Sequence, residues 1–432
     1  MATQTEAVLS GEDALAIVDP ANYVDWDSLL DRFDKLRSET PVVRVVNDEV
    51  HDPFWLVTSY DDVMRISKDN KLFLNSPRST TFSDKKSGVF VKSITGGDPN
   101  LVRSLVALDA PTHPKYRRLT QDWFMPKNLG KMEDEIRALA KVTVDRLVDA
   151  GGEADFVPLV SAPYPLHVVM QILGVPEADE QRMLFLTQQM FGGQDEDLNK
   201  SGMANMTPEQ IMQLVVGAVA DFEAYFAKLT QEKRANPTDD VASVIANAKV
   251  DGEHLSDRDM AGYYIILAAA GHDTTSASTA GAMMALAQDP EQFARLKADR
   301  DLLPGIVEEA IRWTTPVQHF MRTAAEDTEL GGQKIAKDDW LMISYIAANH
   351  DESVFPDPRK FDASRSPNRH LSFGAGAHQC LGLHMARLEM RILFNELLDR
   401  IETLELAGEP KRAKSTFVGG LKTLPIRYSL SK

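Results

Sequence analysis

The feature that most constrains this chain is one long apolar stretch, from Asp259 to Gln288. Within it, the run Tyr263–Ala270 is apolar nearly all round, and a helix of that kind is buried in the middle of a large domain. Its centre nevertheless reads Gly271–Thr275, a Gly-His-Asp-Thr-Thr string. Polar groups inside a buried helix are costly unless they have partners or a function. The sequence therefore predicts a large, mainly helical domain with a site at the middle of its central helix.

Charge and hydrophobicity narrow the class of protein. The 432 residues include 47 basic and 64 acidic side chains, for a formal charge of −17, and 43% are hydrophobic. This negative charge argues against a nucleic-acid partner, because phosphates must be neutralised by cations. The stretch Met1–Asp19 lacks the basic and apolar regions of a signal peptide, and no window holds ~18 uninterrupted apolar residues. We expect a cytoplasmic protein with no membrane segment.

Local patterns predict small sheets in a mainly α chain. Val42–Val46 and Phe54–Thr58 are typical of short strands, and the pattern turns helical after Tyr60. Thr207-Pro208 is typical of a helix start, with Thr as the N-cap. Leu330–Ser344 is predicted to be a hairpin with turns at its two glycines and at its Lys-Asp-Asp string.

The domain organisation is expected to be simple. Residues 1–20 are predicted to be an N-terminal extension, and residues 21–432 a single catalytic domain. The segment Gly192–Met206 is rich in Gly, Asp and Asn, and we expect it to form a mobile cover.

The only cysteine, Cys380, lies in the string Phe373–Gly382, just before a long apolar helix. A thiol at a helix N-terminus is favoured as thiolate, which suits a metal whose other ligands are not protein. A lone buried cysteine is, by itself, more often an inert small hydrophobe. A nucleophilic cysteine with His378 as base lacks an orienting group. A phosphate-binding reading fails because Gln379 stands where the third glycine belongs.

Several strings, in this order along the chain, resemble the cytochrome P450 family. The Cys380 string resembles the haem-thiolate loop, and Ala270–Thr275 resembles the oxygen-binding stretch of the central helix. Glu309–Arg312 resembles the Glu-x-x-Arg pair, Phe355–Arg365 the stretch before the haem loop, and His113–Arg117 a haem contact. The resemblance covers nearly the whole chain after about residue 20. It is closest to the soluble bacterial members, in the group around the α-terpineol hydroxylase of pseudomonads.

The resemblance implies a mainly α fold with small sheets, in which haem b lies between the central helix and the Cys-loop helix. Cys380 would be the axial thiolate, which pushes electron density onto the iron. The implied contacts to the haem propionates are His113, Arg117, Arg322 and His378.

The same resemblance assigns roles to the polar centre of the central helix. Thr274 would be the hydrogen-bond donor in oxygen activation, and Asp273 part of the proton supply. A Thr hydroxyl can also bond back to the carbonyl of Ala270 and bend the helix. His272 is expected to be a packed, hydrogen-bonded residue and not a metal ligand.

Two further residue sets follow from the resemblance. A buried ion-pair cluster behind the haem would have a structural role; its members are Glu309, Arg312 and Arg365. Mostly apolar residues would line the substrate space above the haem, under a roof formed by Phe82–Val106: Ile266, Ala269, Ala270, Val317, Gln318, Phe417 and Val418. A small or mid-sized hydrophobic substrate is implied.

The function that the resemblance implies is a haem-thiolate monooxygenase acting on a terpenoid or aromatic hydrocarbon. Because little chain follows the cysteine, we expect electrons from a [2Fe–2S] ferredoxin with an NAD(P)H-dependent reductase, and a monomer. The candidate docking residues are Lys115, Arg118, Arg359, Arg387 and Arg391. A peroxide-driven peroxygenase and a non-catalytic haem sensor or ligand carrier are the alternatives; the Asp273-Thr274 pair disfavours both.

Overall fold

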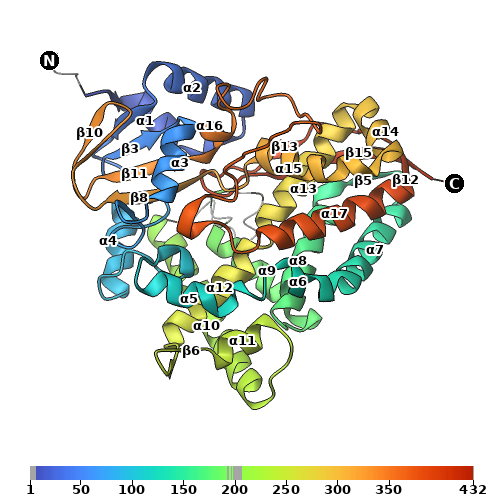
Figure 1. The fold of residues 1–432 in the computed structure, drawn as a ribbon, viewed down its shortest axis with the longest axis horizontal. Helices are drawn as coiled ribbons and strands as arrows, with labels where there is room; N and C mark the ends of the chain where they lie inside the picture. The colour runs from blue at the N-terminus through green and yellow to red at the C-terminus, as the bar shows by residue number, and fades with distance from the viewer. Residues whose placement is uncertain (1–5, 192–193, 196, 198–206, 432) are drawn as a thin grey trace.

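A computed structural model describes residues 6–191, 194–195, 197 and 207–431. It confirms the mainly helical fold with small sheets. A sheet-rich part holds the N-terminal region together with β8, β10 and β11, and a helical part holds α7, α13, α14 and α17 beside it (Figure 1). The expected mobile cover at 192–206 lies outside the described residues, apart from Gln194, Asp195 and Asp197.

The largest sheet joins strands that are far apart in the sequence. Its order is β1-β2-β3-β11-β8-β4. The strands are β1 (Val8–Ser10), β2 (Val42–Val46), β3 (Phe54–Val57), β4 (Phe73–Leu74), β8 (His319–Ala324) and β11 (Trp340–Ser344). The pairing of β3 with β11 is parallel, with Trp55 opposite Leu341. The two early strands and the late strand were expected in separate sheets, and local pattern could not show that they meet.

The expected hairpin at Leu330–Ser344 is right in its first half and wrong in its second. β9 (Thr328–Leu330) and β10 (Gln333–Ile335) pair antiparallel around Gly331 and Gly332, which have φ of 53° and 77°. Such positive φ values favour glycine. β11 then leaves the hairpin and pairs with β3 and β8 instead.

The N-terminal residues are part of the fold and not an extension outside it. β1 pairs in parallel with β2, and α1 (Gly11–Val18) buries Ala14 and Ile17 against the sheet. The expected boundary at residue 20 is therefore wrong for the described residues from Val8 onward. Pairing between strands more than thirty residues apart has no local sequence signal.

Helices make up most of the remaining chain. Those of the first half are α2 (Trp26–Glu39), α3 (Tyr60–Lys68), α4 (Lys85–Ile94), α5 (Thr112–Gln121), α6 (Pro126–Leu129), α7 (Glu133–Asp149), α8 (Pro163–Ile172), α9 (Glu177–Phe191) and α10 (Pro208–Ala235). Those of the second half are α11 (Val241–Asn247), α12 (Asp257–Ala270), α13 (Asp273–Gln288), α14 (Pro290–Ala298), α15 (Leu303–Thr314), α16 (Tyr345–Asn349) and α17 (Leu383–Arg400). The expected start of α10 is confirmed: Thr207 caps it, and Gln210 completes a capping box. No single described helix is long and apolar enough to cross a membrane, although one bent pair passes by length and composition.

Three small sheets were not expected from the sequence. The largest has the order β12-β15-β5, and the other two are two-stranded pairs. Their strands are β5 (Glu153–Asp155), β6 (Lys249–Val250), β7 (Glu253–His254), β12 (Ile401–Leu406), β13 (Lys411–Arg412), β14 (Leu421–Thr423) and β15 (Pro425–Leu430). The link between β13 and β14 carries Phe417 and Val418, two of the residues expected to contact substrate.

The predicted central helix is buried and broken. α12 ends at Ala270 and α13 begins at Asp273, so Gly271 and His272 form the break. The Thr274 hydroxyl donates to the carbonyl oxygen of Ala270 over 2.9 Å. This is the back-bond expected from the sequence, and it takes up one backbone acceptor that the broken helix leaves without its usual partner.

A buried ion-pair cluster ties α15 to the loop that follows α16. Glu309 and Arg312 are both fully buried, and they form two hydrogen bonds, of 2.7 and 2.8 Å. Arg365 reaches the same carboxylate, with its Nε 3.1 Å from each oxygen. Arg312 also donates to the carbonyl oxygen of Asn349 over 2.8 Å. The cluster fixes the chain on both sides of the segment that leads to Cys380.

We predict that Arg312→Ala lowers the free energy of unfolding by about 3–5 kcal/mol, because it leaves the Glu309 carboxylate buried without its main partner. Urea denaturation followed by tryptophan fluorescence measures the change. Arg137→Ala, which breaks the exposed pair with Glu133 on α7, is the matched control and costs less than about 1 kcal/mol. Equal losses in the two variants would contradict a stabilising role for the cluster.

Candidate active site

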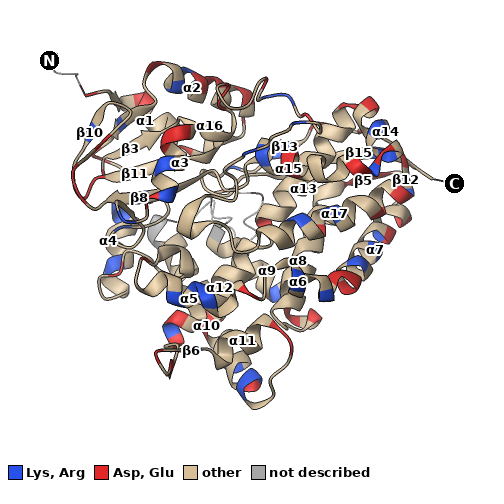
Figure 2. Cartoon of the chain, viewed as in Figure 1, with Lys and Arg blue, Asp and Glu red and all other residues tan. Residues whose placement is uncertain are grey.

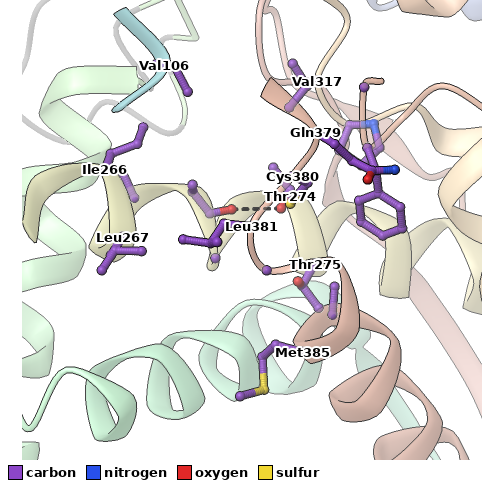
Figure 3. Close-up of a pocket in the computed structure, with 18 of the residues that line it drawn as sticks. Val106, Ile266, Leu267, Thr274, Thr275, Val317, Gln379, Cys380, Leu381 and Met385 are labelled. Atoms are coloured by element: carbon purple, nitrogen blue, oxygen red, sulfur yellow. Dashed lines mark hydrogen bonds between the residues drawn. The ribbon is translucent and has the colours of Figure 1, made fainter. Parts of the chain in front are cut away.

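A mostly apolar cavity lies between the break in the central helix and the loop before α17. Thr274 of the central helix, Cys380 of the loop and Met385 of α17 all line it, and Met385 lies below the other two in the view of Figure 3. Ile266, Leu267 and Val106 lie around the end of the cavity along α12. Charged groups are largely at the periphery of the molecule (Figure 2), so the few that line this cavity stand out.

Cys380 is held by the backbone of its own loop. Its N–H donates to the carbonyl oxygen of Phe373 over 2.8 Å, and the Gly382 N–H bonds to its sulfur. One side of the half-buried residue faces the cavity. Burial raises the pKa of the Cys380 thiol, while the Gly382 N–H and the nearby Arg117 and Arg387 act to lower it. The sulfur thus has the donors that a ligated thiolate needs.

The loop before the cysteine depends on a close approach of two backbones. Gly376 has a φ of 73°, and a Cβ there would lie 2.5 Å from the carbonyl oxygen of Ser67 in α3. Only glycine fits this contact without moving the chain. The loop is thereby pressed against α3, and its far end leads directly into α17, which begins at Leu383.

The four expected haem contacts all line the cavity, and they come from three separate parts of the chain. His113 and Arg117 lie on α5, Arg322 on β8 and His378 in the Cys380 loop. The rings of His113 and His378 are in contact at a tilt of 34°, with centroids 4.0 Å apart. Arg322 is 5% exposed, and its Nη1 donates to the carbonyl oxygen of Met321.

The electrostatics of these groups follow from their burial. Burial, with a smaller contribution from neighbouring cations, lowers the pKa of His113 to about 4 and that of His378 to about 2. Burial also lowers the pKa of Arg117 and of Arg322. The Nε2 atoms of both histidines are buried without a hydrogen-bond partner among the described residues. The two histidines are thus neutral hydrogen-bonding groups, and the two arginines are buried cations. Together they favour the binding of an anion in the cavity.

The residues present fit a haem group. One thiol with a backbone donor to its sulfur lies on one wall of a mostly apolar cavity. Two guanidinium groups and two partnerless imidazole nitrogens lie at the same cavity, and carboxylates such as the two haem propionates would satisfy them. The apolar remainder suits a flat macrocycle.

The polar centre of the central helix faces this cavity. Asp273 and Thr274 both line it, and the Asp273 side chain is 34% exposed. The neighbouring Thr275 also lines the cavity and donates to Glu389 over 3.0 Å. The break therefore presents an acid and a hydroxyl side by side towards the cysteine wall.

Glu389 is a cavity residue that the sequence analysis missed. It is 3% exposed on α17, and burial raises its pKa well above the ordinary 4.5. A neutral carboxylic acid is thus buried beside the cavity. The sequence signal that could have identified Glu389 is its position four residues after Met385, which places an acid on the otherwise apolar face of α17.

Most of the expected substrate-contact residues line the cavity. These are Ile266, Ala269, Ala270, Val317, Phe417 and Val418. Gln318 does not, because its buried side chain reaches Ser415 and Gly419 once its amide is oriented to satisfy both partners. In the expected roof, Phe82–Val106, only Leu105 and Val106 line the cavity. The cavity lining therefore gives no support to Gln318 or to most of the expected roof as substrate contacts, and these remain predictions.

The comparison with known families settles the identity of the fold. The family model described as "Cytochrome P450" matches residues 26–430. The chain belongs to the cytochrome P450 family. The resemblance inferred from the sequence is thereby confirmed, and the protein is a P450 monooxygenase by its family and its monooxygenase relatives.

Relatives of this P450 are bacterial. It is 44% identical to cytochrome P450-terp of Pseudomonas sp., over 96% of this chain and 97% of the relative. It is 32% identical to linalool 8-monooxygenase of Pseudomonas putida, over 92% of this chain and 94% of the relative. The crystal structure of CYP108D1 from Novosphingobium aromaticivorans has a TM-score of 0.92 at 64% identity, covering 99% of this chain and 100% of that one.

We predict that Glu389→Gln stabilises this P450 increasingly as the pH rises. Between the ordinary pKa of 4.5 and its raised native value, native Glu389 keeps a proton that the unfolded chain loses. Wild-type stability therefore falls by up to about 1.4 kcal/mol per pH unit, a loss that Gln avoids. Urea denaturation from about pH 5 to about pH 8 measures the difference. Glu133→Gln, on the exposed face of α7, is the control; a difference independent of pH at residue 389 would contradict a buried neutral acid.

We predict that Cys380→Ser abolishes the red-shifted absorption band of the reduced, CO-bound protein, because a hydroxyl cannot replace the thiolate ligand. The reduced-plus-CO difference spectrum measures it. An unchanged band in the variant would refute Cys380 as the ligand.

Proposed function

We propose that this P450 hydroxylates a small to mid-sized hydrophobic substrate, a terpenoid or an aromatic hydrocarbon, using O₂. We further propose that its electrons come from a [2Fe–2S] ferredoxin with an NAD(P)H-dependent reductase. The observation that carries the proposal is a mostly apolar cavity that Asp273, Thr274 and Cys380 all line.

Haem b, when bound, supplies the chemistry of O₂ activation and insertion of one oxygen atom into a C–H bond. In the proposal the Cys380 thiolate would hold the haem iron, and the Gly382 N–H would moderate the sulfur's donor strength. His113, Arg117, Arg322 and His378 hold the two propionates.

Asp273 and Thr274 handle protons in this proposal. Thr274 holds its hydroxyl at the cavity by donating to Ala270, and it can accept a hydrogen bond in turn. Asp273 lies beside it at the N-terminus of α13, where the helix dipole favours a carboxylate. The pair thus offers a proton carrier and a hydrogen-bonding hydroxyl at the same point of the cavity.

The walls of the cavity support a compact hydrophobic substrate. Ala269 and Ala270 are small and leave room beside the helix break, while Ile266, Val317 and Val418 supply apolar surface. Two relatives carry names that refer to a terpene or a terpene alcohol, P450-terp and linalool 8-monooxygenase. A related structure from Mycobacterium marinum, 31% identical with a TM-score of 0.85 and covering 99% of this chain, is a complex with pseudoionone.

The electron donor would dock on the cysteine side, on α5 and α17. Figure 2 shows Lys and Arg along both helices. Three of the five candidate cations already have carboxylate partners: Lys115 with Asp251, Arg359 with Asp31 and Asp34, and Arg387 with Glu308. Arg118 and Arg391 donate only to backbone carbonyl oxygens among the described contacts. We therefore place the docking face around Arg118 and Arg391.

An optical titration of the ferric protein tests the substrate class. Two panels are used, monoterpene alcohols and aromatic hydrocarbons. A substrate that fits the cavity displaces water and moves the Soret band towards the high-spin form. We expect a saturable shift with terpineol-like alcohols. A shift with flat aromatics alone would assign the aromatic class, and no shift with either panel would overturn the proposed substrate range.

We predict that Thr274→Ala uncouples turnover: NAD(P)H consumption continues while product falls and hydrogen peroxide is released, because the cavity loses the hydroxyl that accepts a hydrogen bond there. Product and peroxide formed per NAD(P)H measure this. Thr279→Ala, five positions further along α13 and outside the cavity lining, is the control. Full product yield from Thr274→Ala would remove Thr274 from oxygen activation.

A further inference from the structure

His272 lies in the break of the central helix, and the proposed function gives it no role. Its ring is 2% exposed. Nε2 lies 3.1 Å from the carbonyl oxygen of Ala162, just before α8, and Nδ1 lies 3.0 Å from Oδ1 of Asp273. The second contact is an ion-pair contact and lacks the geometry of a hydrogen bond. The imidazole therefore connects a fixed backbone acceptor to the acid that faces the cavity.

The chemistry of these two contacts restricts where the protons are. A carbonyl oxygen only accepts, so Nε2 carries a hydrogen towards Ala162. Nδ1 then either carries a second hydrogen towards an ionised Asp273, or presents a lone pair to a protonated Asp273. A neutral ring beside an ionised carboxylate would set a lone pair against a negative oxygen at 3.0 Å, which is repulsive. The contact between His272 and Asp273 is thus attractive when the two side chains together hold one proton more than the neutral ring and the ionised carboxylate.

The surroundings of the ring support this arrangement. Asp273 is the only charged group that acts on His272 among the described residues, and Ala162 is its only hydrogen-bonding neighbour from α8's side of the break. Burial lowers the pKa of His272, but the Asp273 carboxylate and the Ala162 carbonyl raise it by more, so that the net direction is upward. The ring thus favours binding a proton although it is buried.

The two partners differ in their access to the cavity. Asp273 lines the cavity and its side chain is 34% exposed, whereas the His272 side chain is only 3% exposed and the residue is outside the cavity lining. His272 therefore does not contact substrate or cofactor, and any effect it has passes through Asp273. This makes it a positioning residue, because it acts by holding the acid in place.

We propose that His272 and Asp273 form a proton-sharing pair that keeps Asp273 oriented and supplied with a proton for delivery to the cavity. When Asp273 gives up the shared proton, the pair changes from net charge zero to minus one and the Nδ1 lone pair faces the carboxylate. The repulsion favours uptake of one proton from water through the exposed side of Asp273, which restores the pair. The inference rests on the proposed role of Asp273 in proton supply.

The pairing itself is tested without turnover. The imidazole of His272 is titrated by NMR in the diamagnetic, reduced CO-bound holoprotein, and its resonances are assigned by their loss in His272→Gln. We expect the pKa of His272 to lie above 6.5 and to fall in Asp273→Asn, where only burial and the Ala162 carbonyl remain. A pKa that does not respond to Asp273→Asn would overturn the pairing.

The functional consequence is tested by coupling, measured as product formed per NAD(P)H. His272→Gln keeps a donor for Ala162 but cannot titrate, and we expect about a tenfold loss of coupled turnover. Wild-type coupled turnover should fall as the pH rises through the His272 pKa. This pH-dependent fall should be absent from His272→Gln. His167→Gln is the matched control, because His167 pairs with Glu180 on the neighbouring α9, away from the cavity.

A double variant separates this inference from the proposal on which it rests. If His272 acts through Asp273, the variant carrying both His272→Gln and Asp273→Asn matches Asp273→Asn alone. Additive losses, or wild-type coupling in His272→Gln, would overturn the inference while leaving the acid role of Asp273 intact. Wild-type coupling in Asp273→Asn would instead overturn the acid role, and with it the route by which His272 acts.

Discussion

The break in the buried central helix is the constraint on which the cavity depends. A helix that is apolar all round can be buried from end to end, but a broken one must satisfy the backbone groups that lose their partners. Thr274 satisfies the Ala270 carbonyl, and the charge of Asp273 stands at the favourable end of α13. The polar residues that make the break tolerable are therefore the same ones that it presents to the cavity.

The opposite wall is fixed by polar contacts that lead away from the cavity. Asn349 accepts from the Leu371 N–H over 2.7 Å and donates to Ser372 over 2.8 Å, just before the Cys380 loop. Its own carbonyl accepts from Arg312 of the buried ion-pair cluster. A chain of buried contacts thus runs from α15 to the cysteine loop. Rigid positioning of this kind is what a ligand loop requires, because a small misplacement at a reactive centre is costly.

The charge of the molecule and the charge of the cavity are opposite in sign. The chain has a formal charge of −17, yet the cavity wall includes Arg117 and Arg322 and two neutral histidines with partnerless nitrogens. Buried cations are costly unless an anion accompanies them. The cavity is thus arranged to hold a dianionic group within an acidic protein. Among the described contacts, the surface cations Lys115 and Arg387 pair with carboxylates, whereas Arg118 and Arg391 donate to backbone carbonyl oxygens.

The sequence by itself determined the fold class, the family, the thiolate loop and the break in the central helix. Each of these follows from a short local string, such as Gly271–Thr275 or the residues around Cys380. The chemistry of such a string can be inferred from its own residues, without knowing what packs against it. Only the tertiary structure decided that β3 pairs with β11, that residues 8–18 belong to the sheet, and that Gln318 turns away from the cavity. It also brought His272 against Ala162 and buried Glu389 beside Thr275. These facts join residues tens to hundreds of positions apart, and pairings at that distance are set by packing and by the satisfaction of buried polar groups, which no local pattern encodes.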